Sequence, residues 1–385
     1  MAARKRSIFE EVGEAAPDRS AQATTGVIDR AARTGARRAI RLWLLVLFAL
    51  VVTMIAVGGL TRLTDSGLSI TEWAPIAGAI PPLSAADWQA AFDAYREIPE
   101  YQLQNRGMSL AEFQVIYWWE WGHRQLGRVI GLVWALGFLG FLVFRQIPAG
   151  WTGRLLLLGA LGGLQGAIGW WMVASGLTGT MLDVASYRLA THLGLAFVIL
   201  GLIAWYVLRL SRPERDLLQA RRARERKLWG MSTGLLHLCF LQILLGALVA
   251  GIDAGRNYTD WPLMAGGLLP PGILEIEPLW RNFFENDGLV QFIHRVTGYV
   301  LLIFAGVVWL AGRRSVHAAT RRAFGLMAAL TLAQVVVGIV TVMNSAPLAL
   351  ALLHQLTAVA LWVAILRARF LSGYPQATSL RGAPA

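Results

Sequence analysis

Four of the six histidines in this sequence are well placed to bind a metal. They are His123, His192, His294 and His354, and each lies at the outer start of an apolar segment. An imidazole surrounded by hydrocarbon is costly and is by default functional. Two imidazoles on facing helices hold the iron of a low-spin haem in many membrane proteins. The sequence therefore predicts two haem sites, one between His123 and His192 and one between His294 and His354.

A zinc site is the competing interpretation of these histidines. Zinc needs three or four ligands at one point, usually with a carboxylate or a thiolate among them. Histidines in matched pairs fit that arrangement less well than they fit haem. The remaining two, His237 and His317, are assigned no role, because the first lies in the middle of an apolar segment and the second in a polar loop.

One carboxylate near the histidines points to chemistry rather than to binding alone. Glu120 precedes His123 by three residues, and Gln291 precedes His294 by the same distance. A carboxylate beside an iron ligand can accept a proton or stabilise a developing cation, whereas an amide can do neither. We therefore expect the site with Glu120 to perform the reaction and the site with Gln291 to transfer electrons. A solvated carboxylate in an outer loop is the alternative.

Arginines follow both of the histidines that have these neighbours. Arg124 comes directly after His123, and Arg295 comes directly after His294. A guanidinium at this depth suits a porphyrin propionate, although an arginine that reaches to the membrane interface has the same pattern. Arg128 and Arg188 lie nearby in the sequence.

The elements that position these residues are membrane-spanning helices. Of 385 residues, 56% are hydrophobic and 15% are charged, against about 25% charged in a soluble domain, which excludes an ordinary soluble enzyme. Eight apolar segments have nearly the ~20 residues that cross a bilayer as a helix. They are Ile40–Gly59, Leu126–Phe144, Leu155–Val173, Leu189–Leu208, Leu228–Ile252, Leu289–Leu310, Ala323–Met343 and Leu348–Leu366. The single cysteine, Cys239, lies in one of these segments, so no disulfide can form within the chain.

The basic residues predict how the chain is oriented. With eight spans, 26 of the 35 Lys and Arg residues lie on the side of the two termini. Loops rich in Lys and Arg stay on the cytoplasmic side, so both termini are expected there. The net charge of +12 then reflects topology, and no nucleic-acid partner is needed to explain it.

The second half of the sequence repeats the first. The segment from Asp65 to Trp73 matches the segment from Asp253 to Trp261 at an offset of 188 residues. Further matches pair His123-Arg124 with His294-Arg295, Gln165 with Gln334, and His192 with His354. Because both copies begin on the same side, they form a parallel repeat. The fold class expected is an all-α polytopic membrane protein with two pseudo-symmetric four-helix bundles.

This repeat defines five expected parts of the chain. A cytoplasmic tail (1–38) precedes an N-terminal bundle with a long outer loop (39–210). A basic inner linker (211–228) then leads to a C-terminal bundle (229–370) and a second tail (371–385).

Two motifs make the sequence resemble a known family. Gly-Gly-Leu-Thr-Arg-Leu-Thr-Asp-Ser-Gly-Leu-Ser (58–69) and Glu-Phe-Gln-Val-Ile-Tyr-Trp-Trp-Glu-Trp-Gly-His-Arg (112–124) are similar to segments of haem A synthases. The resemblance implies eight helices in two bundles and oxidation of the C8 methyl group of haem O to the formyl group of haem A. It also implies that Glu120 and His123 are catalytic, that His123 and His192 flank the substrate, and that His294 and His354 bind haem b. One branch of the family has an outer-loop cysteine pair, which is missing here, so this chain is similar to the other branch.

The same resemblance implies partners and a location. Haem O would come from a haem O synthase, and the product would serve cytochrome oxidase in a bacterial inner membrane, with the haem sites near the periplasmic side. The electron acceptor, the mechanism of methyl oxidation and the oligomeric state, including a homo-oligomer, are left open. The alternative function is a di-haem b cytochrome that only transfers electrons.

Overall fold

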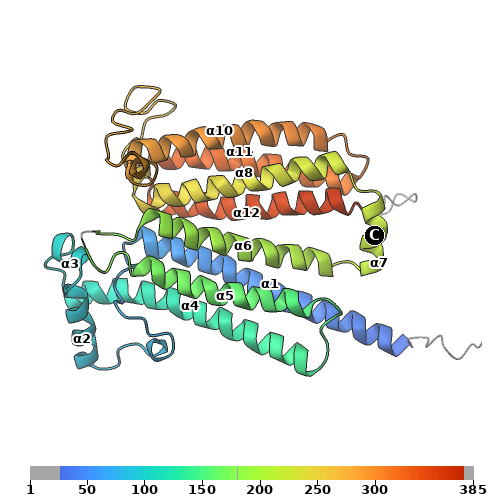
Figure 1. Cartoon of the computed structure of the whole chain (residues 1–385), viewed down its shortest axis with the longest axis horizontal. Helices are drawn as coiled ribbons and strands as arrows, with labels where there is room; N and C mark the ends of the chain where they lie inside the picture. The colour runs from blue at the N-terminus through green and yellow to red at the C-terminus, as the bar shows by residue number, and fades with distance from the viewer. Residues whose placement is uncertain (1–26, 180, 377–385) are drawn as a thin grey trace, which may run out of the picture.

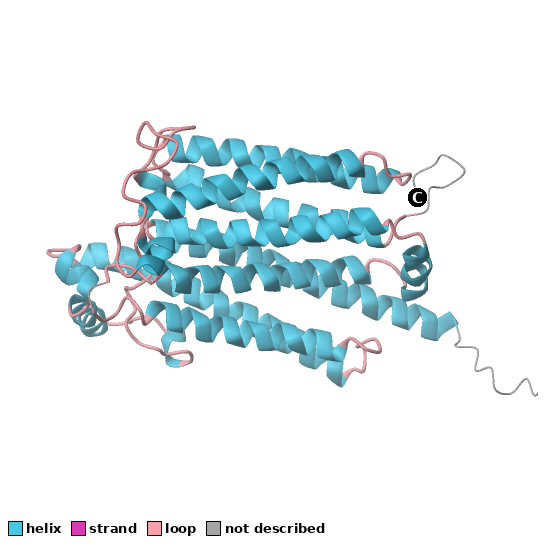
Figure 2. Ribbon diagram, turned by 45° about the horizontal axis from the view of Figure 1, so that its top comes forward, coloured by secondary structure: helices cyan, strands magenta, loops and turns pink. Residues whose placement is uncertain are grey.

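The structure, a computed structural model, describes residues 27–179 and 181–376, and these form helices and loops with no β-strand among them (Figure 2). The long helices are α1 (Val27–Leu63), α4 (Leu110–Val143), α5 (Thr152–Val173), α6 (Ser186–Leu210), α8 (Arg226–Gly251), α10 (Asp287–Gly312), α11 (Ala318–Met343) and α12 (Leu348–Gly373). The short helices are α2 (Ala85–Arg96), α3 (Pro99–Leu103), α7 (Glu214–Arg222) and α9 (Asn282–Glu285), with 3₁₀ turns at Ala77–Ala79, Ala254–Arg256 and Leu279–Arg281.

The eight long helices pack as two closed rings of four. In the first half of the chain, α1 packs against α4 and α6, and α5 closes the ring between them. In the second half, α8 packs against α10 and α12, and α11 closes that ring. Figure 1 shows the second set lying above the first, with all eight helices running in nearly the same direction. Every one of these helices is long and apolar enough to cross a membrane.

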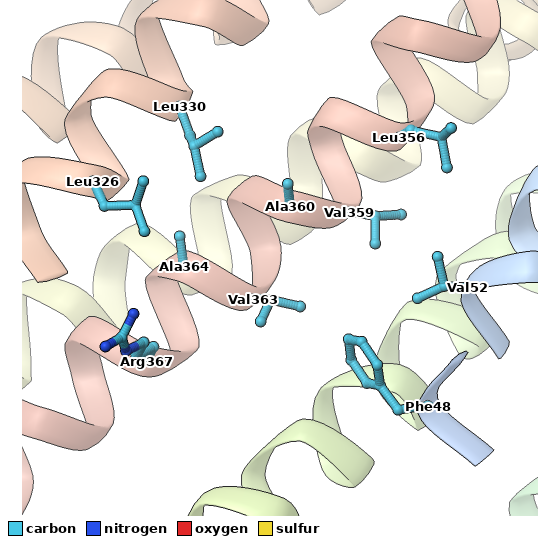
Figure 3. A pocket seen from close by; sticks show the side chains of 10 residues that line it. All are labelled: Phe48, Val52, Leu326, Leu330, Leu356, Val359, Ala360, Val363, Ala364 and Arg367. Carbon is cyan, nitrogen blue, oxygen red and sulfur yellow. The ribbon is translucent and has the colours of Figure 1, made fainter. Parts of the chain in front are cut away.

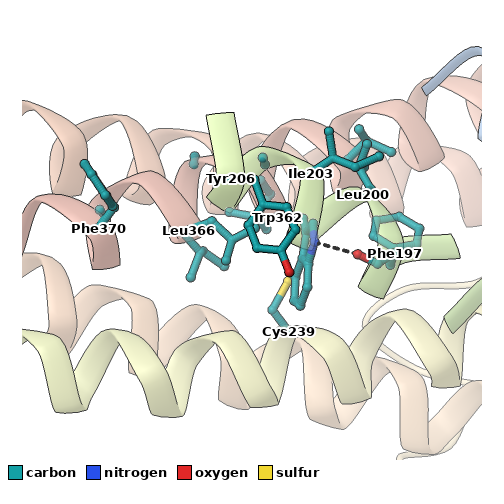
Figure 4. Packing of buried hydrophobic residues seen from close by; sticks show 14 of the residues in the cluster. Phe197, Leu200, Ile203, Tyr206, Cys239, Trp362, Leu366 and Phe370 are labelled. Atoms are coloured by element: carbon teal, nitrogen blue, oxygen red, sulfur yellow. Dashed lines mark hydrogen bonds between the residues drawn. The ribbon is translucent and has the colours of Figure 1, made fainter. Parts of the chain in front are cut away.

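A shared apolar core joins the two rings along α6, α8 and α12. Phe197 and Leu200 of α6 pack with Cys239 of α8 and Trp362 of α12, all of them buried (Figure 4). The Trp362 indole N–H donates to the main-chain oxygen of Phe197 at 3.1 Å. Gly201 allows this approach, because a Cβ atom there would lie 3.0 Å from the Trp362 ring nitrogen. The halves are therefore one hydrophobic unit.

The loops lie at the two ends of the helices. The short connections and α7 lie at the end where α1 begins and α12 ends, and the long loops with α2, α3 and α9 lie at the opposite end (Figure 1). We call the second end the outer end. Its two long loops are residues 64–109, between α1 and α4, and residues 252–286, between α8 and α10.

The eight predicted spans are confirmed as eight candidate membrane helices, but one boundary was wrong. The predicted second span begins at Leu126, whereas α4 begins at Leu110. Charged and aromatic residues lower the hydropathy of this outer part without preventing a helix. Ser109 and Glu112 start it with a capping box, in which each side chain accepts a hydrogen bond from the other residue's main-chain N–H. Glu120 and His123 therefore lie on one continuous helix.

The predicted tails differ from the structure where it describes them. Residues 1–26 and 377–385 lie outside the described residues. Of the expected N-terminal tail, residues from Val27 onward belong to α1, and α12 continues into the expected second tail as far as Gly373. The basic linker 211–228 contains α7.

Candidate functional site

The four matched histidines lie on helices that are diagonal within their rings. His123 is on α4 and His192 is on α6, while His294 is on α10 and His354 is on α12. The histidines of each pair are close enough for their charges to interact. All four are half-buried, so each ring keeps surface that the described protein does not cover. Each pair therefore faces the inside of its own ring of helices.

Each of the four imidazoles packs against a glycine of a neighbouring helix. A Cβ atom on any of these glycines would come within 2.8–3.1 Å of Cε1 of the ring, which is closer than ordinary van der Waals contact. The pairs are His123 with Gly58 of α1, His192 with Gly169 of α5, His294 with Gly246 of α8, and His354 with Gly338 of α11. Glycine is thus required at four equivalent places to seat the rings.

Three of the four imidazoles also contact a glutamine amide one helical turn before that glycine. In each case the amide Nε2 atom lies near both ring nitrogens, and Oε1 is buried without a hydrogen-bond partner among the described residues. The pairs are Gln165 with His192 (3.3 and 3.2 Å), Gln242 with His294 (3.1 and 3.3 Å), and Gln334 with His354 (3.2 and 3.3 Å). Gln165 and Gln242 donate to the main-chain oxygen of their histidine as well.

Glu120 is buried, with 3% of its surface exposed, and its carboxylate is surrounded by donors. Its Oε2 atom accepts from the Ser69 hydroxyl and from the main-chain N–H of Ile70, both at 2.8 Å. Its Oε1 atom accepts from Nε and Nη2 of Arg124 at 3.0 and 2.6 Å. The alternative of a solvated loop carboxylate is therefore wrong, because Glu120 joins α4 to the outer loop beside His123.

Gln291, the counterpart of Glu120, is buried to the same degree but acts with the opposite polarity. Its Nε2 atom donates to the main-chain oxygens of Ala254 and Tyr258 at 2.7 and 3.2 Å. Its exposed fraction is 2%. Glu120 accepts hydrogen bonds from its loop, whereas Gln291 donates them. The two sites thus have the same architecture but differ in charge.

The arginines after the two histidines hold the outer loops against the helices. Arg124 donates to the main-chain oxygens of Ile70 and Glu72 at 2.8 and 2.9 Å. Arg295 donates to the oxygens of Tyr258 and Asp260, which are the same loop positions in the second half, at 2.7 and 2.9 Å. Contact with a propionate stays a prediction for both, and each guanidinium has at least one structural role.

The two nearby arginines have other partners. Arg128 donates to the main-chain oxygens of Ala74 and Pro75 at 3.0 and 2.9 Å, which fixes the next part of the first outer loop. Arg188 lies over the Trp171 ring, with its guanidinium carbon 4.6 Å from the ring centre, and donates to the Trp171 main-chain oxygen. Neither residue contacts one of the four histidines.

The residues present fit a haem in each ring of helices. An iron-bound imidazole uses one nitrogen for the metal and donates its other N–H to a nearby acceptor. The unpartnered Oε1 atoms of Gln165, Gln242 and Gln334 are such acceptors, buried next to the rings. A glutamine amide also carries donors, so it can serve either ring tautomer. In the part of the chain that is described, no three His, Cys, Asp or Glu residues gather as a metal-binding group of the kind that zinc needs.

Arg62 joins the two halves at the outer end. Its side chain, 11% exposed, forms ion pairs with Asp65 at 2.9 Å, with Asp183 at 3.3 Å and with Asp253 at 2.9 Å. Asp65 and Asp253 are repeat counterparts, and both adopt left-handed backbone conformations, with φ of 47° and 53°. Burial raises the pKa of Asp183, and the charge of Arg62 opposes that rise. A single arginine thus serves matched carboxylates from both loops.

A second buried carboxylate lies in the first outer loop. Glu100 of α3 is 2% exposed, and its Oε2 atom has no hydrogen-bond partner among the described residues. Burial, followed by the charges of Asp183, Asp65 and Glu120, raises its pKa to about 8. The second outer loop has no residue matched to it in the repeat.

An apolar groove of about 510 Å³ lies away from all of these residues, between α1, α11 and α12 (Figure 3). Its walls carry Phe48 and Val52 on one side and Leu356 and Val363 on the other, with Arg367 as the one charged lining residue. The groove has no group able to bind iron. It is a hydrocarbon-facing surface and not the candidate site.

Sequence reasoning brought together the four histidines, Glu120 and Gln291, but it missed part of the site. Gln242 was not noticed, and Gln165 and Gln334 were aligned without a role. The available signal was a Gln-x-x-x-Gly pattern in three apolar segments, at 165–169, 242–246 and 334–338. The ion pairs of Arg62 had no sequence signal, because Asp183 and Asp253 are 121 and 191 residues away from it.

Comparison with known proteins agrees with this arrangement. Residues 41–366 match the sequence profile of the COX15-CtaA family, described as cytochrome oxidase assembly protein. The chain belongs to this family. The matched region covers all four histidines, Glu120 and Gln291.

Curated relatives in the family extend the similarity to nearly the whole chain. A protein named heme A synthase from Dinoroseobacter shibae is 72% identical over 382 residues, which cover 99% of this chain and 100% of the relative. Proteins of the same name from Ruegeria pomeroyi and Paracoccus denitrificans are 70% and 63% identical over 98% of this chain and 99% of each relative.

Proposed function

We propose that this chain is an enzyme that makes haem A, by oxidising the C8 methyl group of haem O to a formyl group. The observation that carries this proposal is its 72% identity, across 99% of its length, to a protein named heme A synthase. The product is the haem of cytochrome oxidase, in agreement with the family description.

In this proposal the two rings of helices have different tasks. The first ring binds haem O between His123 and His192, beside Glu120. The second ring binds haem b between His294 and His354. Three features support the assignment: the diagonal placement of each pair, the glycine behind every ring, and the buried amide oxygens next to three of them. Haem b, when bound, would supply reversible one-electron transfer.

Glu120 is the group that we expect to act on the substrate's surroundings. Converting a methyl to a formyl group removes electrons and protons from one carbon atom. A carboxylate beside His123 can accept such a proton or oppose positive charge that develops there. Arg124 and the Ile70 N–H orient the carboxylate, and the first outer loop excludes water above it. Gln291 has no charge with which to do the same.

The repeat supports a common origin for the two bundles. Ile70 and Tyr258, which contact Arg124 and Arg295, are 188 residues apart, as are Asp65 and Asp253. We propose two pseudo-symmetric bundles that diverged at Glu120 and Gln291.

We also propose that both termini lie in the cytoplasm of a bacterial cell and that the outer end faces the periplasm. The distribution of Lys and Arg supports this orientation. A reporter fused after Ala385 or within residues 212–227 should be active only in the cytoplasm, and one inserted in residues 84–106 only outside. An externally active fusion at the C-terminus would contradict the eight-span topology.

The alternative is a di-haem b cytochrome that passes electrons without changing a porphyrin. Haem extraction and mass analysis of protein purified from cells that also contain a haem O synthase separates the two functions. Haem O or haem A beside haem b supports the synthase. Haem b alone at both sites supports the electron carrier and would overturn the proposal.

A further inference from the structure

One of the four histidines lacks the partner that the other three share. The Gln-x-x-x-Gly pattern that supports His192, His294 and His354 is replaced on α1 by Met54-x-x-x-Gly58. Gly58 still seats the His123 ring. The residue one helical turn before it is a methionine, and no amide takes its place.

Met54 occupies the position of Gln242. The two residues are 188 apart, the offset of the repeat. The methyl carbon of Met54 lies 3.6 Å from a Cβ atom built on Gly127, and Nε2 of Gln242 lies 3.3 Å from one built on Gly298. These two glycines follow His123 and His294 by four residues each. Both side chains therefore reach the same point beside the histidine helix.

The exchange removes hydrogen bonding from one imidazole. A thioether has no donor and is only a weak acceptor. Within residues 27–179 and 181–376, the His123 ring has no hydrogen-bond partner, whereas each of the other three rings has an amide within 3.3 Å. Partners of this kind fix the orientation of a metal-bound imidazole and raise its basicity, and losing one typically costs about 10–100-fold in metal affinity.

We propose that Met54 makes His123 the labile ligand of the first site, the one that releases the iron so that haem O can enter and haem A can leave. This inference rests on the proposed function, because it takes His123 and His192 to be ligands of the substrate porphyrin. His192, held by Gln165, keeps the porphyrin seated. The second site has an amide at both rings, as a site that never exchanges its cofactor requires. Met54 is a positioning residue, since it acts through His123.

Carbon monoxide binding measures this lability directly, because the gas binds ferrous haem only where an axial ligand leaves. Three variants are compared with the wild type after reduction with dithionite: Met54→Gln, Met54→Leu and Gln242→Met. Porphyrin content is measured by extraction, so that carbon monoxide binding is expressed per haem O or haem A in the first site and per haem b in the second.

We expect the first-site porphyrin of the wild type to bind carbon monoxide, and haem b not to. Met54→Gln, which supplies the missing amide in a side chain of similar volume, should weaken carbon monoxide binding at the first site by about 10–100-fold. Gln242→Met should make haem b reactive toward the gas. Met54→Leu keeps the size without a hydrogen bond and should retain the wild-type carbon monoxide affinity.

Equal carbon monoxide affinity in Met54→Gln and the wild type, at equal porphyrin content, would overturn the inference. A changed iron spectrum in Met54→Leu would also overturn it, by showing that the methionine sulfur acts as a ligand. If Met54→Gln loses its haem b and so fails to fold, Gln242→Met decides the question alone, and an unreactive haem b in that variant counts against the inference. Haem b in both wild-type sites would refute the proposed function instead, while the titration would still compare the two ligand environments.

Discussion

The two outer loops are held to their helices by the same contacts made with opposite polarity. In the first half, Glu120 accepts hydrogen bonds from its loop and forms an ion pair with Arg124 at 2.6 Å. In the second half, Gln291 donates to its loop, and Arg295 forms no ion pair with it. One architecture therefore accommodates either a charged or a neutral residue beside the histidine. The carboxylate is not needed to build the site, which leaves its charge as the feature that requires another explanation.

This comparison also shows what Glu120→Gln would do to the structure. The new amide could donate to carbonyl oxygens of the first loop as Gln291 does to those of Ala254 and Tyr258. It would leave the N–H of Ile70 or a donor of Arg124 without its present acceptor, at a cost of about 1–3 kcal/mol. Because the second half folds with that pairing, we expect the variant to fold.

The largest expected effect separates the two halves by their haem. Replacing His354 with Leu removes one of the two proposed ligands of haem b, so the low-spin haem b spectrum should disappear completely. Haem O bound in the first half should remain. The measurement is a reduced-minus-oxidised spectrum together with extracted haem content.

His237→Leu is the matched control for this variant. His237 is a mid-helix histidine whose Nδ1 atom lies 2.8 Å from the main-chain oxygen of Thr233, away from both pairs. Its loss should leave both haems in place. An unchanged haem b spectrum in His354→Leu would show that the second pair does not bind this haem.

A smaller effect is expected where the halves meet. Arg62→Met keeps the aliphatic stem but leaves Asp65, Asp183 and Asp253 without their shared cation. Removing one partner of a buried ion pair costs about 3–5 kcal/mol. The three carboxylates are 34–40% exposed, so solvent screening lowers our expectation to about 2–3 kcal/mol. Thermal unfolding and proteolysis of the outer loops in detergent measure this loss.

Arg96→Gln tests whether the Arg62 effect is specific. Arg96 pairs with Asp93 at 3.5 Å, and both side chains are at least half exposed. Exposed pairs contribute about 0–1 kcal/mol, so this variant should melt at nearly the wild-type temperature. If both variants lose the same stability, the Arg62 cluster does not join the two loops in a special way.

The smallest effect is expected at Glu100, which exists in the first outer loop only. Its pKa is raised from 4.5 to about 8 by burial, so between these values the unfolded chain releases a proton that the folded chain retains. Folding therefore becomes less favourable as pH rises from about 4.5 to about 8, and the penalty is constant above that range. Glu100→Gln removes this penalty.

We expect Glu100→Gln to be more stable than the wild type by roughly 1–2 kcal/mol at pH 8, since the loop can open without unfolding the spans. The difference should vanish near pH 4.5. Melting curves across this range measure it, with Glu97→Gln, an exposed neighbour, as the control. A difference that does not change with pH would mean that Glu100 is not protonated in the folded loop.

The spans and the histidine pairs could be predicted from the sequence because their signals are local. Apolar runs near 20 residues define a membrane helix, and the repeat places each histidine at a matched depth. The start of α4 could not be predicted from hydropathy, because Glu112, Glu120 and Arg124 interrupt the apolar pattern. The capping pair of Ser109 and Glu112 was the signal available there.

Contacts between distant loops could not be predicted, because they depend on how the helices pack. Nothing local indicates that Glu120 accepts from Ser69 and Ile70, which are 51 and 50 residues away. The Met54 and Gln242 difference is intermediate, since the repeat offset reveals it once the partner of each histidine is known. Tertiary structure was needed to show that these positions lie beside the rings.

The most direct test of the central claim, that the first half performs the chemistry and the second does not, exchanges the two residues that differ. Haem A and haem O are quantified by extraction from Glu120→Gln, Gln291→Glu and the wild type at equal protein and equal haem b content. A general-base or electrostatic contribution is worth about 10²–10⁴-fold in rate. Glu120→Gln should therefore accumulate haem O or a partly oxidised hydroxymethyl form at the expense of haem A, and Gln291→Glu should produce haem A as the wild type does. A wild-type yield of haem A from Glu120→Gln would contradict the account.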